Sequence, residues 1–277
     1  MRARHLIGLA PIALYLAAFT LAPVLSTLWL SVTGSAGGLT LEHFRQIGGH
    51  YQFGEAVLNT LGITGLSLAL ELGVGLAAAL ALATRPRGRA TFQVLLLIPL
   101  GVPTIVAAAV MRTIFGTVGY LNEVLFRLRL IEIPVDWVGD RLLALGAVAA
   151  ADAWKVTPLV LLILLAGLEA IPADLYEAAR TDGASRWRQF TAITLPLLKP
   201  ALSMAVIVRG VDAFRIFALP LALAGHGLPV LSTYAYTEYL EYGNPHTAAA
   251  SSVVLLVMIL VAVGVYLRLA GPEEVLR

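Results

Sequence analysis

Six long apolar runs limit this chain to a bundle of membrane-spanning helices. The runs are Leu6–Val32, Val57–Thr84, Thr91–Phe115, Leu142–Leu168, Leu197–Ala222 and Thr247–Leu269. Each is long enough for a helix that crosses ~30 Å of hydrocarbon, which takes ~20 residues. Hydrophobic residues make up 59% of the 277 residues and charged residues 13%, against about a half and a quarter in soluble domains. We therefore predict an all-α integral membrane protein with one domain, residues 1–277.

The first apolar run is too long for a secretory signal peptide. Basic residues (Arg2, Arg4 and His5) precede it, as in a signal peptide, but the run extends from Leu6 to Val32. The apolar core of a signal peptide has only ~7–15 residues and ends at a small-residue cleavage site. We predict a first transmembrane helix here, bent at Pro11 and Pro23.

The basic residues between the runs predict the orientation in the membrane. Cytoplasmic segments carry an excess of Lys and Arg. If the N-terminus is cytoplasmic, the cytoplasmic segments hold eleven of these residues and the external segments four. The tight turn Arg85–Arg89 is the clearest marker. We expect both termini on the cytoplasmic side.

The sequence lacks the residues and motifs that mark several functional classes. Without cysteine, there is no disulfide, thiol catalysis or cysteine metal site. Neither lysine, Lys155 or Lys199, follows a glycine, so no phosphate-binding P-loop is present. The sequence also lacks a G-x-S-x-G elbow, an H-E-x-x-H motif and a close carboxylate pair. The net charge of +2 is spread along the chain, which does not favour nucleic-acid binding. We expect no enzymatic activity, metal or cofactor in this chain, so that any ATP would be used by another polypeptide.

The connection between the fourth and fifth runs is the most polar stretch of the middle of the chain. Pro172 and Asp174 fit a helix start, and Gly183 fits a left-handed helix end. Ser185 can cap a second short helix, Arg186–Ala192, which we expect to end before Pro196. The residues alone leave two interpretations open. One is a surface loop with its basic residues at lipid headgroups, and the other is a docking element.

Three external segments are long enough to hold structure. Thr40–Ile47 is expected to form a short helix, and Gly119–Leu130 an amphipathic helix lying on the membrane, with an i, i+4 pair of Glu123 and Arg127. Trp137 is expected at headgroup level. The third segment, Gly225–Pro245, carries four tyrosines, which favour either an aromatic belt or a docking surface for an external partner.

Charged residues inside the apolar runs form a second group of candidate functional residues. The fifth run contains Arg209, Asp212 and Arg215, and the fourth contains Asp152 and Lys155. An unpaired charge at mid-bilayer costs at least ~2.5–3.5 kcal/mol, so these side chains should face protein or a water-filled cavity. The cluster is either an ion-pair network that fixes the fifth helix or a lining of the solute path, since Arg can donate several hydrogen bonds to sugar oxygens. Glu71, in the second run, has no evident partner in the sequence and is expected to hold helices together.

The polar connection resembles the EAA loop of bacterial ABC-importer permeases. Its residues EAARTDGASRWRQFTAITLP are similar to the pattern E-A-A-x3-G-x9-I-x-L-P of that family. The matching positions are Glu177, Ala178, Ala179, Gly183, Ile193, Leu195 and Pro196. The stretches Asp152–Ser185 and Val208–Gly225 resemble the carbohydrate-uptake branch, and the similarity covers nearly the whole chain. Leu219–Pro220 and the short Gly225–Val230 depart from the pattern of that branch, which weakens any inference about solute contact there.

The resemblance implies a six-helix, type I ABC-importer permease of the maltose and trehalose type, whose coupling helix (segment 172–196) lies between helices four and five. The residues expected to contact the ATPase are Tyr176, Glu177, Ala178, Ala179, Asp182, Gly183, Ala184 and Arg186. In the family, the acidic residue at the position of Glu177 contacts a basic group of the ATPase.

The resemblance also implies partners and a substrate class. The partners would be a second, similar but not identical permease, a dimer of cytoplasmic ATP-binding subunits that holds ATP and Mg, and an extracytoplasmic solute-binding lipoprotein. The chain would form half of the pathway for a mono-, di- or oligosaccharide in a bacterial cytoplasmic membrane. Two alternatives stay open. One is a permease for another polar solute such as glycerol phosphate, and the other is a secondary transporter that uses the ionisable cluster as a proton or sodium path.

Overall fold

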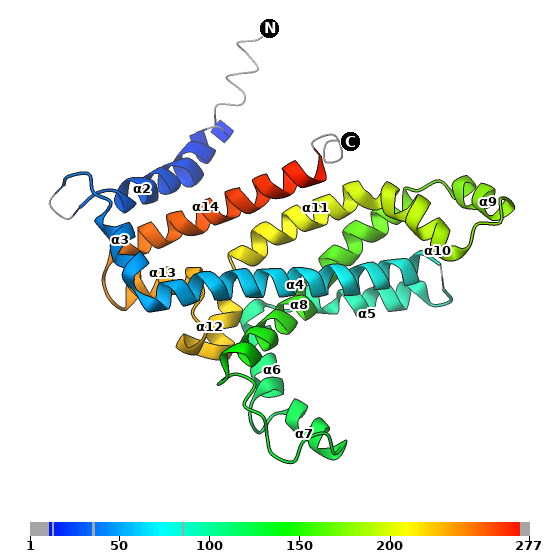
Figure 1. Cartoon of the computed structure of the whole chain (residues 1–277), viewed down its shortest axis with the longest axis horizontal. Coiled ribbons are helices and arrows are strands. Elements are labelled where there is room, and N and C mark those ends of the chain that lie inside the picture. The colour runs from blue at the N-terminus through cyan, green and yellow to red at the C-terminus, as the bar shows by residue number, and fades with distance from the viewer. Residues whose placement is uncertain (1–10, 13, 35–36, 85, 272–277) are drawn as a thin grey trace, which may run out of the picture. The chain divides into compact units, whose positions relative to one another are not determined.

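The computed structural model of this chain describes residues 11–12, 14–34, 37–84 and 86–271. Over this described part the chain is helical, and its only strand-like pairing is an isolated bridge between Thr33 and Leu39 (Figure 1). Within the described residues, six helical stretches are long and apolar enough to cross a membrane. They are Leu14–Val32, Tyr51–Ala83, Thr104–Arg127, Arg141–Glu169, Arg186–Phe214 and Pro245–Ala270.

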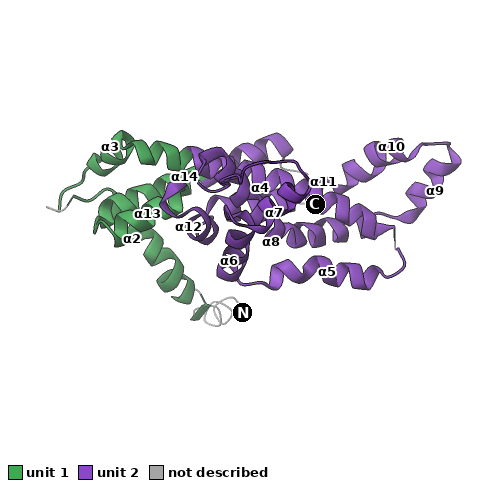
Figure 2. Cartoon of the chain, turned by 90° about the horizontal axis from the view of Figure 1, so that it is seen from below, with its two compact units in different colours: residues 1–57, 230–258 green, residues 58–229, 259–277 purple. Residues whose placement is uncertain are grey.

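The chain divides into two compact units, drawn in different colours in Figure 2. Unit 1 consists of residues 1–57 and 230–258. It contains α2 (Ala22–Ser31), α3 (Glu42–Gly49), α13 (Leu231–Leu240), the start of α4 (Tyr51–Ala83) and the first part of α14 (Pro245–Ala270). Its small core is built around Ile47, Leu231 and Tyr234. Segments from both ends of the sequence therefore pack together.

Unit 2 consists of residues 58–229 and 259–277. Its helices include α8 (Arg141–Glu169) and α11 (Leu195–Phe214), which contribute Val160, Leu164 and Leu198 to its core. At Gly167 of α8, an added Cβ would lie only 2.5 Å from the Ala201 Cβ of α11. Glycine is required there because it lets the two helix backbones approach closely, as small residues do in membrane bundles.

The prediction of one helix over the third apolar run is wrong. The run is divided into α5 (Arg89–Gly101) and α6 (Thr104–Phe115), which point in different directions in Figure 1. The break lies at Val102, whose backbone is extended (φ −77°, ψ 126°). Pro103 follows it, and a proline disfavours helical conformation in the preceding residue. The spanning stretch begins only at Thr104 and includes α7 (Tyr120–Arg127).

The fifth apolar run also differs from its prediction. Helix α11 ends at Phe214, and a separate helix, α12 (Ala218–Ala224), follows. Inside one long helix, Pro220 would remove a hydrogen bond and clash with the preceding turn. In the first turn of α12 it costs little, because the N–H groups there have no partner within the helix.

The expected end of the second short helix before Pro196 is wrong as well. Helix α10 (Arg186–Gln189) continues through a π turn, η2 (Phe190–Thr194), directly into α11. The Leu195 N–H bonds to the Phe190 carbonyl, one residue further back than in an α-helix. The wider turn accommodates Pro196, which has no N–H to donate. A second π turn, η1 (Ala17–Leu21), precedes Pro23 in the same way, so the first helix also continues past its proline.

The remaining predictions lie close to the observed elements. Helices α4, α8 and α14 cover the second, fourth and sixth runs. Helix α3 is close to the predicted Thr40–Ile47, and α7 lies within Gly119–Leu130 with the expected pair, Arg127 Nε to Glu123 Oε1, at 2.6 Å. Trp137, expected as an anchor, donates its indole N–H to Asn122 Oδ1 at 2.9 Å. Residues 1–10, where the first helix was expected to begin, lie outside the described residues.

Candidate functional site

The polar connection in unit 2 is a helix, a glycine turn and a second helix, in the order predicted. Helix α9 (Ala173–Thr181) ends at Asp182, and Gly183 follows with a φ of +75°. The Ala184 N–H bonds to the Ala179 carbonyl at 2.9 Å, and the Gly183 N–H to the Arg180 carbonyl at 3.0 Å. These two bonds define a Schellman motif, which requires the left-handed conformation that glycine adopts without penalty.

Side-chain bonds fix the second helix against the turn. The Ser185 hydroxyl accepts a hydrogen bond from the Arg188 N–H at 3.3 Å, as an N-cap does. The Gln189 amide donates to the Ala184 carbonyl at 2.8 Å. The Tyr176 hydroxyl lies 2.9 Å from the Thr194 hydroxyl of the π turn. Helix α9 is thus bonded to the turn that follows it, through the Schellman motif, and to the π turn η2, through Tyr176.

The outer surface of this segment is exposed. Glu177, Ala178, Asp182 and Arg186 are all exposed, while Tyr176, Ala179 and Ala184 are half-buried. Glu177 lies 3.7 Å from Arg180, but both side chains are largely in solvent, so this pair contributes little stability. Trp187, on the second helix, is 72% exposed. The Trp187 ring contacts that of Phe190, with the ring centroids 5.8 Å apart, and the segment still presents most of this ring and the Glu177 carboxylate to solvent.

The second candidate site is a buried ion cluster centred on Arg209 of α11. Arg209 is 1% exposed, and its guanidinium bonds to both carboxylate oxygens of Glu71 in α4, each at 2.7 Å. Glu71 is 0% exposed. This two-point geometry is the strongest that an arginine and a carboxylate form. It gives Glu71 a partner that the sequence did not identify, because the two residues lie 138 positions apart.

Two further carboxylates complete the cluster. Arg209 also donates to Asp152 of α8 at 3.0 Å and to Asp212 at 2.5 Å. Arg215, at the end of α11, lies 3.6 Å from Asp212, and both of these side chains are more than half exposed. The predicted group Arg209, Asp212, Arg215 and Asp152 is therefore contiguous. Its inner part is buried and its outer part reaches the surface of unit 2.

A pocket adjoins the outer part of the cluster. Its volume is about 320 Å³, and Asp152, Lys155, Asp212 and Arg215 supply its charged lining. Lys155 also donates to the Val102 carbonyl at 3.0 Å, at the break between α5 and α6. The lysine thus pairs an acceptor that the end of α5 leaves free. Charged side chains from α8 and from the end of α11 thus meet the two helix ends at one cavity, whose remaining lining is mainly apolar.

A comparison with protein families identifies the chain. Residues 72–270, which contain both the exposed segment and most of the ion cluster, match the family described as "binding-protein-dependent transport system inner membrane component". The chain belongs to this family. It is accordingly a multi-pass membrane protein and a component of a transport system.

Relatives of this inner membrane component are similar over almost their whole length. The chain is 35% identical over 93% of its length to the trehalose/maltose transport system permease protein MalF of Thermococcus litoralis, of which it covers 90%. It is 33% identical over 95% of its length to the trehalose transport system permease protein SugA of Mycobacterium tuberculosis, of which it covers 87%. The recognition of an ABC-importer permease from the EAA loop is confirmed.

A solved structure has the same fold. It is a bacterial alginate ABC transporter in complex with an alginate pentasaccharide-bound periplasmic protein. One of its chains matches the inner membrane component with a TM-score of 0.86 at 23% identity, over 99% of this chain and 96% of that one. The all-α fold with six spans predicted from the apolar runs, and the importer-permease fold that the resemblance implied, are thereby confirmed.

Proposed function

We propose that this chain is one of two membrane subunits that form the pathway of an ATP-driven carbohydrate importer. The observation that carries the proposal is the similarity, over more than nine tenths of the chain, to permeases named for trehalose and maltose. The substrate would be a mono-, di- or oligosaccharide. The chain would sit in a bacterial cytoplasmic membrane with both termini on the cytoplasmic side, as the excess of basic residues favours.

The exposed segment of unit 2 would couple the chain to an ATPase. Glu177, Ala178, Asp182 and Arg186 lie on its open surface, and Gly183 and Ala184 form its turn. Tyr176 and Ala179 hold the two helices together. ATP and Mg would be bound by a dimer of separate cytoplasmic subunits, one of which would receive this surface. A second permease and an extracytoplasmic solute-binding protein would complete the assembly, in line with the family description.

The helical continuity of this region supports a mechanical role. From Arg186 to Phe214 the chain is helical without interruption, so the surface at Trp187 and the buried Arg209 belong to one rod. Movement of the segment by the ATPase would displace Arg209 together with its three carboxylate partners. The importer would then alternate between two states whose populations are set by the different affinities of the ATPase dimer for nucleotide.

The polar pocket of unit 2 is our candidate for a part of the solute path. Its carboxylates accept hydroxyl protons, and Lys155 and Arg215 donate to ring and hydroxyl oxygens. The same two cations favour a second candidate substrate, a phosphorylated polyol such as glycerol phosphate. The family description, which names a binding-protein-dependent system, opposes a secondary transporter.

Uptake by the reconstituted assembly tests the proposal. The chain would be co-expressed with its ATPase, second permease and binding protein, and placed in liposomes. We expect ATP-dependent accumulation of radiolabelled trehalose or maltose, and its loss when Glu177 is replaced by Arg with the complex intact. Accumulation of glycerol phosphate alone would select the second candidate. Undiminished, ATP-stimulated uptake in both Glu177→Arg and Gly183→Val would contradict the coupling assignment.

A further inference from the structure

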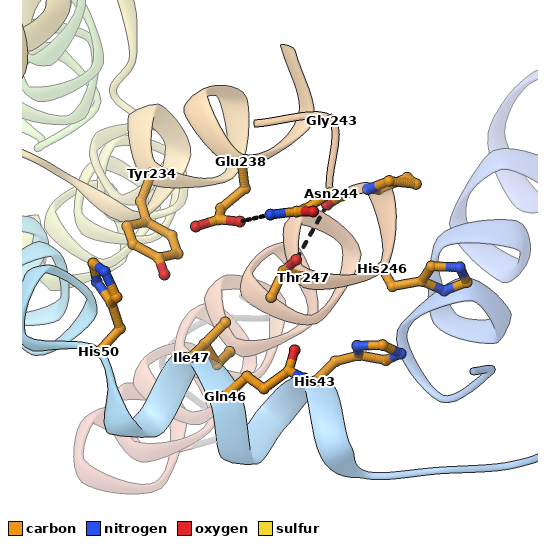
Figure 3. A pocket seen from close by; sticks show the side chains of 11 residues that line it. His43, Gln46, Ile47, His50, Tyr234, Glu238, Gly243, Asn244, His246 and Thr247 are labelled. Atoms are coloured by element: carbon orange, nitrogen blue, oxygen red, sulfur yellow. Dashed lines mark hydrogen bonds between the residues drawn. The ribbon is translucent and has the colours of Figure 1, made fainter. Parts of the chain in front are cut away.

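A second pocket lies in unit 1, in a part of the chain to which the proposed function assigns nothing. It has a volume of about 370 Å³ and is lined by α3, the end of α13 and the start of α14 (Figure 3). This volume is at the small end of the ~300–1,000 Å³ typical of ligand pockets, enough for one small solute. His50 and Tyr234 stand at one end and His43 and His246 at the other (Figure 3).

The central group of this pocket is the carboxylate of Glu238. The residue is only 7% exposed, and its Oε2 accepts a hydrogen bond from the Asn244 amide at 3.2 Å. A carboxylate has about four lone-pair positions, more than this amide uses, and a buried one needs donors. Burial and the adjacent Glu238, to which its hydroxyl is hydrogen-bonded, raise the pKa of Tyr234, so the phenol keeps its proton and its oxygen remains an acceptor.

The histidines at the other end are oriented by backbone carbonyls. A ring nitrogen of His246 lies 3.0 Å from the Leu30 carbonyl, and one of His43 lies 3.2 Å from the Thr33 carbonyl. Each of these nitrogens must be the protonated one, because a carbonyl only accepts. The two rings are stacked, with centroids 4.9 Å apart and planes inclined by 16°. In a neutral ring, the second nitrogen is an acceptor.

The lining as a whole does not suit an anion or a metal ion. Glu238 is the only acidic residue among the eleven that line the pocket, and none is lysine or arginine. A phosphate or carboxylate ligand would meet no permanent positive charge. Among the described residues, no group of three or more His, Cys, Asp or Glu side chains is arranged to hold a metal ion. What remains is a mixture of neutral donors and acceptors around one carboxylate and one aromatic ring.

We propose that this pocket is a second solute site, which binds a hydroxyl-rich molecule the size of about one sugar ring. Neighbouring hydroxyls of such a solute would donate to Glu238 and to the phenol oxygen of Tyr234, and its apolar face would rest on the rings. The hydroxyl chemistry follows from the lining itself. The assignment of the site to the external side of the membrane rests on the proposed function. With that orientation, the connections after the first and fifth spans are both external, so the pocket would receive solute before translocation.

Histidine signals allow a direct test in the full chain. Three of the five histidines line this pocket, and His226 belongs to unit 2. The chain, labelled with ¹³C at histidine and placed in lipid nanodiscs without the ATPase, would be titrated with trehalose. We expect saturable shifts of the His43, His50 and His246 signals and an unshifted His226 signal, with choline and inorganic phosphate unable to compete.

Two substitutions and one matched control complete the test. Glu238→Gln, which keeps the shape, should weaken trehalose binding by about tenfold or more, because a bond to a charged group is lost. Glu241→Gln, one turn further along and outside the lining, should leave binding unchanged. Thr247→Val removes a hydroxyl of the lining and should weaken binding a few-fold even if Glu238→Gln does not fold.

Four results would overturn this inference: no shift of the three signals, an affinity for trehalose that is unchanged by both substitutions, displacement by choline, or displacement by phosphate. Uptake by the reconstituted wild-type assembly is scored separately. Normal uptake without a shift of the three histidine signals would reject only the second site. Shifted histidine signals without ATP-dependent uptake would reject only the proposed function.

Discussion

Arg209 and Glu71 form a two-point ion pair in which neither side chain is more than 1% exposed to solvent. The pair joins α11 to α4, and Asp152 of α8 lies on the same guanidinium. Three helices of unit 2 are thus held by one cation. An arginine buried in this way has no water to replace a lost carboxylate, so the network is stable only when complete.

Replacement of Glu71 by Gln should destabilise the chain strongly. Removing one partner of a buried ion pair typically costs ~3–5 kcal/mol, because the other charge stays buried. We expect a clear fall in the apparent melting temperature in detergent, followed by tryptophan fluorescence. The control is Glu123→Gln, which breaks the exposed pair with Arg127 and should change little. Equal effects of the two substitutions would show that the buried network does not stabilise the bundle.

Removal of both charges should restore part of that loss. A Glu71→Met, Arg209→Met double variant, built in an Asp152→Asn background so that no buried carboxylate loses its arginine, leaves no unpaired buried charge, and buried ion pairs can often be replaced by apolar side chains at little cost. We expect its melting temperature to lie above that of Glu71→Gln and its transport to be lower than that of the wild type. Strictly additive single effects in a double-mutant cycle would exclude coupling between the two residues.

Gly183→Ala should weaken the turn without disturbing its surroundings. An added Cβ would meet no atom within 4 Å, so the cost is the left-handed backbone alone, with a φ of +75°. That cost is about 1–2 kcal/mol. We expect faster amide hydrogen exchange in α9 and α10 and reduced ATP-dependent uptake. Gly65→Ala, within α4 and equally free of neighbours, is the matched control and should be neutral. Unchanged exchange in Gly183→Ala would argue against a strained turn.

Lys155→Met should loosen the break between α5 and α6. The substitution keeps most of the side-chain length but leaves the Val102 carbonyl without its 3.0 Å donor. An unpaired buried polar group costs about 1–3 kcal/mol. We expect higher exchange at the start of α6 and lower uptake, whereas Lys155→Arg, which can still donate, should retain most of both. An equal loss of uptake in the two variants would point to a role of the lysine other than this bond.

Tyr176→Phe should separate α9 from the π turn. The substitution removes only the hydroxyl, which lies 2.9 Å from that of Thr194. A net cost of about 0.5–1.5 kcal/mol is expected. We expect faster exchange in Phe190–Thr194 with little change in the overall melting temperature, and weaker stimulation of the ATPase by the assembled permease. Thr194→Val should have the same effect, and the double variant should be no worse than either single one.

Local sequence signals predicted much of this architecture. Hydropathy identified α4, α8 and α14, and Pro172, Gly183 and Ser185 marked the turns of the exposed segment because caps depend on neighbouring residues only. Hydropathy does not register a change of helix direction between equally apolar residues, so the breaks at Val102 and after Phe214 were missed. Pro103 and Pro220 were the available signals at those breaks.

Contacts between distant residues were beyond the reach of the sequence. Glu71 and Arg209 each stood out as a charge in an apolar run, but nothing indicated that they pair across 138 positions. The histidines of unit 1 are isolated along the chain, and His43 and His246 become neighbours only because α3 and α14 meet. In both cases, the two residues meet because of how the helices pack, and no pattern of neighbouring residues in the sequence indicates that packing.

The π turn between α10 and α11 makes the chain unequally sensitive to changes in length. A π turn holds one residue more than the corresponding α turn. Deletion of one residue within Phe190–Thr194 can therefore be absorbed by conversion to a regular helix, with the Trp187 surface and Arg209 still in register. Between Leu197 and Val208 the helix has no extra residue to lose. Deletion of one residue there would rotate Arg209 by about 100° away from Glu71.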